Sequence, residues 1–251
     1  LTRFLTVFSI VIFLSTSAHA APKGTSDVLF GLDNPTQSSW NKWWQEMQTY
    51  RRERLQAIGM DSGKYKDTAS AWSDGTFRQF YVFMYDEDFY RDGKYRTHEW
   101  LDELTSKFGR IDSVMLWQAY PRLGFDRRDQ YDYYRQMPGG LSALREQVVD
   151  VFHENGVRVF VDYNPWDQNA SHEEMADITA ALDADGVNLD TLNDVPTTLK
   201  NALDRRKPGL VLVPERRVPD RDLPVARSSW AQWYDLGEAD GVEKPSVFRQ
   251  K

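Results

Sequence analysis

The sequence predicts an α/β protein in which parallel strands alternate with helices, most simply arranged as a (β/α)8 barrel. Three observations predict this fold. From residue 78 onward, segments with the apolar, β-branched composition of strands alternate with segments of helical periodicity. Short loops join them, as in right-handed βαβ units. Polar residues follow the end of one strand after another, as they do at the active-site edge of such a barrel.

Five strand segments with four helices between them can be placed in order. Before them, charged and aromatic residues at helical spacing predict one helix within residues 34–58, with Trp40, Trp43 and Trp44 near its start. Gly109 and Gly156 are expected to end helices. The strands are expected within residues 78–86, 111–120, 157–163, 186–190 and 209–215, and the helices within 97–109, 139–156, 171–185 and 197–207.

The choice between a closed barrel and an open sheet depends on motifs and on strand ends. A nucleotide-binding open sheet would carry a Gly-rich turn, and neither G-x-G-x-x-G nor a P-loop motif occurs. The barrel is therefore favoured, although only five units can be counted. We expect an incomplete barrel, the alternative being an open sheet. The expected organisation is a signal peptide at 1–20, an N-terminal extension at 21–77, the βα repeats at 78–215 and an irregular C-terminal segment at 216–251.

The N-terminus has the pattern of an export signal. Arg3 precedes an apolar run from Phe4 to Leu14, and small residues follow up to Ala20. The run is too short to span a bilayer, so we expect no stable membrane insertion. The pattern predicts export to the periplasm or the extracellular space with cleavage near Ala20, the alternative being a buried N-terminal helix.

Composition excludes several classes of function. The net charge is −7 and the basic residues are scattered, which argues against a nucleic-acid partner. The absence of cysteine excludes disulfides, thiolate-bound metals and thiol nucleophiles. We expect no cofactor. Calcium is possible through Asp162, Asp167 or Asp185, because carboxylates are its preferred ligands.

Three acidic residues follow consecutive strands. Asp162, Asp190 and Glu215 are separated by 28 and 25 residues, each one βα unit. Neighbouring strands lie about 4.8 Å apart, which brings such acids within the roughly 5 to 10 Å that glycoside hydrolysis requires. Mutual repulsion also allows a protonated acid beside an ionised one. The structural alternatives are that Asp190 caps the next helix and that Glu215 pairs with Arg216 or Arg217.

The segment GFDRRDQYDYYRQMPGGLSALREQVVDVFHENGVRVFVDYNPWD resembles part of the α-amylase-type glycoside hydrolases, as do DGVNLD and the acid after the fifth strand. The resemblance implies that Asp190 is the nucleophile, Glu215 the general acid/base and Asp162 a sugar-binding residue. It is distant: Trp166 and Asp167 replace an Asn-His pair, and Asn188 replaces an arginine. Barrel glycosidases in general are the closest description.

The sequence therefore predicts an exported glycoside hydrolase that acts on an oligosaccharide or polysaccharide. Aromatic residues near the strand ends would stack on sugars, and polar ones would hydrogen-bond hydroxyl groups. The alternative functions are a non-catalytic carbohydrate-binding barrel, or an inactive fragment of a longer glycosidase. The structural alternative for the residues themselves is that Trp117 and Tyr120 belong to the core and that Arg127 pairs with Asp129. Besides Asp162, the expected substrate-binding residues are Trp117, Tyr120, Asp126, Arg127, Asn164 and Trp166, with Tyr163 a further stacking candidate.

Overall fold

The computed structural model describes residues 36–57, 59, 68–118, 127–216, 218–219, 222–223 and 225–230. The chain divides into two units, Arg54–Asp235 and a second one made of Leu1–Glu53 with Leu236–Lys251. The expected signal peptide at 1–20 and residues 231–251 lie outside the described residues. The predicted N-terminal helix is present as α2 (Gln37–Ala57). None of the helices in the described ranges has both the length and the apolar composition needed to cross a bilayer.

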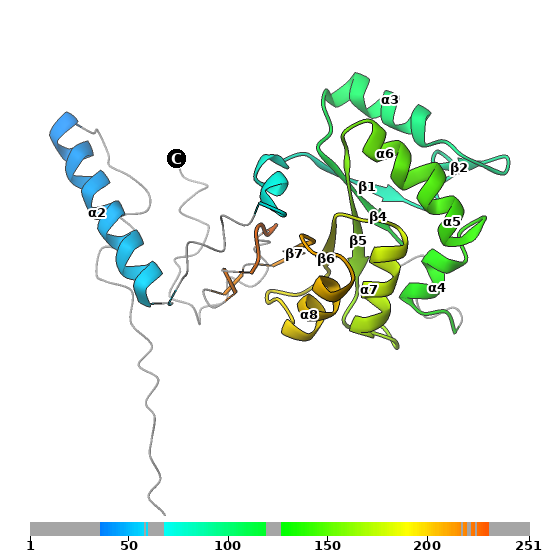
Figure 1. Ribbon diagram of the computed structural model, residues 1–251. Coiled ribbons are helices and arrows are strands. Elements are labelled where there is room, and N and C mark those ends of the chain that lie inside the picture. Colours follow the sequence, from blue (N-terminus) through cyan, green and yellow to red (C-terminus); the bar gives the residue numbers. More distant parts are fainter. Residues whose placement is uncertain are drawn as a thin grey trace, which may run out of the picture. The chain divides into compact units, whose positions relative to one another are not determined.

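A five-stranded parallel sheet forms the centre of the larger unit (Figure 1). Its strand order follows the chain, so every strand pairs with the next predicted strand in parallel. The predicted α/β class and all five predicted strands are confirmed. The strands are β1 (Gln79–Phe83), β4 (Ser113–Trp117), β5 (Arg158–Tyr163), β6 (Gly186–Leu189) and β7 (Val211–Pro214).

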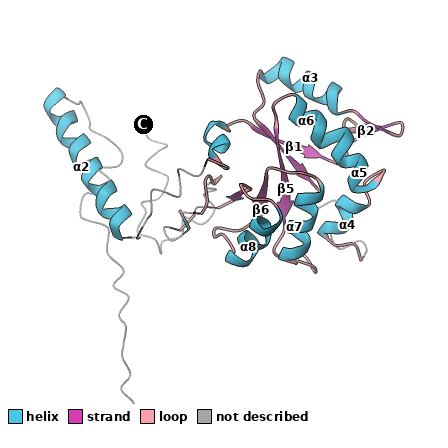
Figure 2. Cartoon of the chain, in the orientation of Figure 1, coloured by secondary structure: helices cyan, strands magenta, loops and turns pink. Residues whose placement is uncertain are grey.

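Helices follow the strands as predicted (Figure 2). The helix expected at 139–156 is continuous but contains a π-helical turn. Gly109 ends α3 with a positive φ of 74°, which a glycine adopts without steric cost. The helices are α3 (Thr97–Phe108), α5 (Gly140–Leu144) with the π-helical η3 (Arg145–Val149) and α6 (Asp150–Glu154), α7 (His172–Ala181) and α8 (Thr197–Arg206).

Three short elements were not predicted. The 3₁₀-helix η2 (Ala71–Gly75) precedes the sheet, and the hairpin of β2 (Tyr90–Arg91) and β3 (Lys94–Tyr95) follows β1. Helix α4 (Gln130–Arg135) lies in a stretch expected to be a loop, and the Asp129 carboxylate caps it by accepting from two backbone N–H groups. The cap also accounts for Asp129, which was weighed as an ion-pair partner of Arg127.

Strand residues alternate between two chemically different faces. One face carries small aliphatic side chains such as Val114, Val161 and Leu189, which join the main core with Phe152 of α6 and Met175 of α7. Figure 1 shows the helices that follow the strands on this side of the sheet. The other face carries larger side chains, and its buried members form a second cluster of Met115, Phe160, Val211 and Val213 with Trp72, Trp117 and Trp230 packed against it.

The first turn of α7 is held by two side chains. Ser171 caps the helix, and its hydroxyl accepts from the Glu174 N–H at 3.3 Å. The Glu174 carboxylate accepts from Arg135 at 2.7 Å and from Asn169 at 3.1 Å. This acid therefore connects α7 to α4 and to the loop after β5.

Asp185 shows how the amino-terminal edge of the sheet is held. Its buried carboxylate accepts from the Val159 N–H and the Arg158 guanidinium, both at 2.9 Å, and lies 2.7 Å from His153. These bonds lower the pKa of Asp185 against the opposing effect of burial. Asp185 precedes β6, whereas Asp162 lies near the carboxyl end of β5, so these two calcium candidates occupy opposite edges of the sheet.

Gly186 provides a test of the sheet packing. A methyl group at this position would lie 2.5 Å from the Val211 carbonyl oxygen and would also collide with the Phe160 ring. We expect Gly186→Ala to lower the free energy of unfolding by about 2 to 3 kcal/mol, because a backbone atom cannot move aside. Urea denaturation measures the change.

The matched control is Gly75→Ala, where no atom lies within 4 Å of the added methyl. This variant should stay within about 0.5 kcal/mol of the parent. Equal urea midpoints for the two variants would show that the β5–β6–β7 packing described here is wrong.

Candidate functional site

The register of the sheet brings the three predicted acids to one edge and one face. Asp162 in β5 is level with Asn188 in β6, which is level with Val213 in β7. Asp190 and Glu215 directly follow the paired residues Leu189 and Pro214, two positions beyond that level. Because side chains two residues apart in a strand share a face, all three carboxyl groups are on the face opposite the main core.

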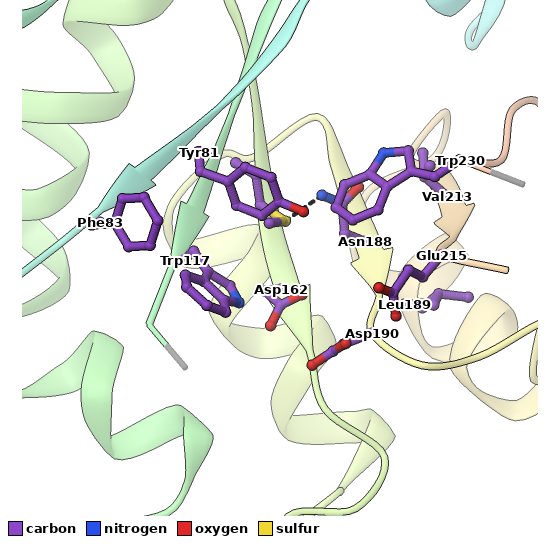
Figure 3. A pocket seen from close by; sticks show the side chains of 11 residues that line it. Tyr81, Phe83, Trp117, Asp162, Asn188, Leu189, Asp190, Val213, Glu215 and Trp230 are labelled. Atoms are coloured by element: carbon purple, nitrogen blue, oxygen red, sulfur yellow. Dashed lines mark hydrogen bonds between the residues drawn. The ribbon is translucent and has the colours of Figure 1, made fainter. Parts of the chain in front are cut away.

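These acids line a pocket of about 260 Å³ (Figure 3). The aromatic side chains come mainly from β1 and β4, and the acids come from β5 and from the residues after β6 and β7. Trp230 closes the remaining side; its backbone N–H donates to the Pro214 carbonyl at 3.1 Å. The lining residues are Tyr81, Phe83, Met115, Trp117, Asp162, Asn188, Leu189, Asp190, Val213, Glu215 and Trp230.

Asp162 is the most buried of the three acids, with 2% of its surface exposed. Burial raises its pKa well above the usual range, and the neighbouring charges of Asp190 and Glu215 raise it further. Hydrogen bonds from Asn164 Nδ2, at 3.0 Å, and from the Trp117 side chain act in the opposite direction. Burial and these neighbouring charges therefore favour the protonated form of Asp162.

Glu215 is positioned by the residue that follows Asp190. Its Oε2 accepts from the Thr191 N–H at 2.6 Å, and its own N–H donates to the Leu189 carbonyl at 3.1 Å. Thr191 has a φ of 60°, in the left-handed region that β-branched residues rarely adopt. Strained backbone of this kind is concentrated at functional sites. Here it turns a backbone N–H toward the carboxylate.

The structural alternatives for these acids can now be judged. Asp190 does not cap the next helix, because Pro196 occupies the N-cap position of α8. Asp190 is 8% exposed and its N–H donates to the Tyr163 carbonyl at 3.0 Å, which extends the β5–β6 pairing. The alternative for Glu215 was an ion pair with Arg216 or Arg217 at the surface. Its carboxylate accepts from the Thr191 N–H, and Arg217 lies outside the described residues.

Aromatic rings form the wall opposite the acids. The centroid of the Tyr81 ring lies 5.7 Å from that of Trp117 and 5.5 Å from that of Trp230, both edge-to-face. Phe83 lies 5.1 Å from Trp117 in the same arrangement. Tyr81 is 41% exposed and Phe83 49%, so this wall is accessible from the pocket side. Flat apolar surfaces of this kind suit the apolar face of a sugar ring.

A buried hydrogen-bond network fixes the end of β5 under the pocket. The Tyr134 hydroxyl accepts from the Asp162 N–H at 2.9 Å and lies 2.8 Å from the Leu116 carbonyl. The Gln130 side chain accepts from the Asn164 N–H at 2.8 Å and donates to the Asn164 carbonyl at 2.9 Å. Each of these hydrogen bonds joins residues that are distant in sequence. Together they hold the backbone of β5 at Asp162 in place.

Asn164 therefore has a different role from the one predicted. It was expected to bind sugar hydroxyls, but its side chain is fully buried, does not line the pocket and donates to Asp162. The expected stacking residue Tyr163 faces the main core, where its hydroxyl donates to the Ala170 carbonyl at 3.1 Å. Both belong to the support of the site and not to its surface.

The remaining predicted binding residues divide into two groups. Trp166 is 46% exposed and Arg127 is exposed, and neither lines the pocket. The carbonyl of Arg127 accepts from Gln168 Nε2 at 2.8 Å. Tyr120 and Asp126 lie outside the described residues. Of the predicted side chains, the structure thus brings together Asp162, Asp190, Glu215 and Trp117.

Seven lining residues were not predicted, and four of these are aromatic or polar. Tyr81 and Phe83 alternate with buried Val82, a period-two pattern that could have identified them as neighbours of Trp117. Asn188 lies two residues before Asp190 and therefore on the same face, so the same period-two pattern could have identified it. Trp230 comes from a segment without strand or helix periodicity, and no local pattern pointed to it.

Metal ligation has little support among the described residues, in which no group of three or more His, Asp or Glu side chains is arranged to hold an ion. The calcium candidate Asp167 uses its carboxylate oxygens for the N–H groups of Gln130 and Gln168, at 2.5 Å and 2.6 Å.

The chain has no significant match among protein-family models, curated proteins or solved structures. The chemistry of the pocket must be inferred from its residues.

Asp162 gives a pH-dependent test of the site. The unfolded chain ionises this acid near 3.8, whereas the folded chain does so at a higher pH. Folding therefore costs free energy above the unfolded pKa, and this cost is absent when both states are protonated. We expect Asp162→Asn to raise the free energy of unfolding at neutral pH, because the amide removes the cost of burying an ionised carboxylate.

Urea denaturation at several pH values measures this difference, which should shrink toward zero below pH 3.8. Asp102→Asn, at an exposed position on α3, is the control and should show no comparable gain. A variant of Asp162 that is destabilised at neutral pH would contradict a raised pKa at this acid.

Proposed function

We propose that this protein is an exported glycoside hydrolase that acts on an oligosaccharide or polysaccharide. One observation carries the proposal: three carboxyl groups at the carboxyl ends of consecutive parallel strands share one pocket with an aromatic wall. Glycoside hydrolysis needs two carboxyl groups on either side of the scissile bond and a surface that orients the sugar. The proposed export is supported by the sequence of residues 1–20.

In the proposed mechanism, Glu215 delivers a proton to the leaving oxygen as the glycosidic bond breaks. Asp190 acts from the other side, as the nucleophile at the anomeric carbon. Glu215 is held by the Thr191 N–H, which fixes the direction of its carboxyl group. Asp162, whose pKa is raised by burial, donates a hydrogen bond to a sugar oxygen in its protonated form, as a buried neutral carboxylic acid can.

We further propose that the sheet is part of a (β/α)8 barrel. The consecutive strand order, the uniformly parallel pairing and the pocket at the carboxyl ends of the strands support this. The face that carries the pocket would then be the barrel interior. A crystal structure with a layer of helices covering the pocket side of the sheet would contradict the barrel.

The catalytic roles are tested with Asp190→Asn and Glu215→Gln in the full chain. Once a panel of glycans has identified a cleaved substrate, each change should lower kcat by at least about 10³-fold, because each removes a group that acts at the reacting bond. Reducing-end release measures turnover. The control is Asp194→Asn, which alters an acid on the same loop that does not line the pocket.

Three outcomes decide between the alternatives. Recovery of turnover by azide in Glu215→Ala would support a retaining mechanism with Glu215 as acid/base. Undiminished hydrolysis in both conservative variants would refute the catalytic assignment. Glycan binding without turnover in the parent protein, unaffected by Glu215→Gln, would instead favour a non-catalytic carbohydrate-binding protein.

A further inference from the structure

The pocket presents an unpaired hydrogen-bond acceptor. Asn188 is 2% exposed, and its Nδ2 donates to the Met115 sulfur. Its Oδ1 has no hydrogen-bond partner among the described residues. A buried acceptor left without a donor costs about 1 to 3 kcal/mol. A ligand that brings an N–H or O–H donor to this oxygen would remove the cost.

Several donors around the pocket are already used by the protein. The Trp230 indole N–H donates to Gln79 Oε1 at 3.2 Å, and the Trp117 side chain bonds Asp162. The Thr191 N–H is used by Glu215. The polar groups of Asn188, Asp190 and Glu215 therefore offer mainly acceptors, and a complementary ligand has to supply donors.

The charge of the pocket also favours a ligand that supplies hydrogen-bond donors. Its lining includes Asp162, Asp190 and Glu215, and no Lys, Arg or His is among the described lining residues. Any charge that these lining residues carry is therefore negative. The rings of Tyr81 and Trp117 stand near these acids (Figure 3), and aromatic faces attract cations.

An ammonium group matches all three properties. It has three donors, no acceptor and a positive charge. We propose that the pocket binds its glycan through a sugar unit with a free amino group, a hexosamine in the ammonium form, and rejects uronate and sulfated sugars. A uronate or sulfate would add acceptors and negative charge to a pocket that is already acidic and rich in acceptors. The choice of a sugar as the ligand rests on the proposed function.

The test compares sugars that differ in charge but little in shape. Glucosamine, galactosamine, N-acetylglucosamine and glucuronate are titrated into the full chain at mildly acidic pH, where a primary amine is protonated. Trp fluorescence is the readout, because Trp117 and Trp230 line the pocket. We expect the two amino sugars to bind about tenfold more tightly than the N-acetyl sugar, and glucuronate to show no measurable binding.

Two variants locate the preference in this pocket. Asn188→Leu removes the unpaired acceptor at similar volume, and Glu215→Gln replaces one acidic group by a neutral amide of the same shape. Each should bring the affinity ratio of glucosamine to N-acetylglucosamine closer to one, whereas Asp194→Asn should leave it unchanged. Circular dichroism verifies folding, and if Asn188→Leu does not fold, Glu215→Gln alone decides.

Equal affinities for the amino and N-acetyl sugars, or tighter binding of glucuronate, would overturn this inference. A failure here is distinguishable from a failure of the proposed function. Hydrolysis of a neutral glycan without any amine preference would leave the hydrolase proposal standing and refute the charge selection. Amine preference that depends on Glu215, without cleavage of any glycan, would support the charge selection and refute the catalytic proposal.

Discussion

The parallel pairing of β5, β6 and β7 is the constraint on which the site depends. A shift of one residue in any of these strands would turn its acid toward the helix-covered face, because side chains alternate along a strand. The register is fixed by packing as well as by backbone bonds: Gly186 leaves space for the Phe160 ring, and Asp185 ties the start of β6 to β5. The position of the carboxyl groups is thus a consequence of packing at the opposite end of the strands.

The buried carboxyl group of Asp162 connects stability with the proposed chemistry. An isolated acid in an apolar setting would be neutral and inert, and an acid in water would be fully ionised. Asp162 lies between these cases: it is almost fully buried, yet it interacts with the charges of Asp190 and Glu215. The network of Tyr134, Gln130 and Asn164 holds its backbone in place, so the unfavourable burial is maintained by neighbouring structure.

Much of the fold was predictable, because it is encoded locally. Apolar β-branched runs identify the five strands, and Gly109 and Gly156 mark helix ends. The three acids were predictable for the same reason, since each follows its strand directly. The β2–β3 hairpin was predictable in principle: Asp92 and Gly93, both with positive φ, form the Asp-Gly turn that such hairpins favour.

The missed features depend on contacts between distant residues. Asn164 looked accessible because it follows a strand, but Gln130, 34 residues earlier, draws its backbone into the core. Trp230 reaches the pocket from a segment without periodicity, through its bond to Pro214. Closure of the sheet into a barrel stays a prediction, as does the role of each acid.

The central claim is that three carboxyl groups share one pocket and influence one another. NMR titration of the Asp162 side-chain carboxyl carbon, in the parent protein and in Glu215→Gln, tests it most directly. The account predicts a titration midpoint above the ordinary 3.8 that falls when the Glu215 charge is removed. A midpoint at or below 3.8 that is insensitive to Glu215 would contradict the account.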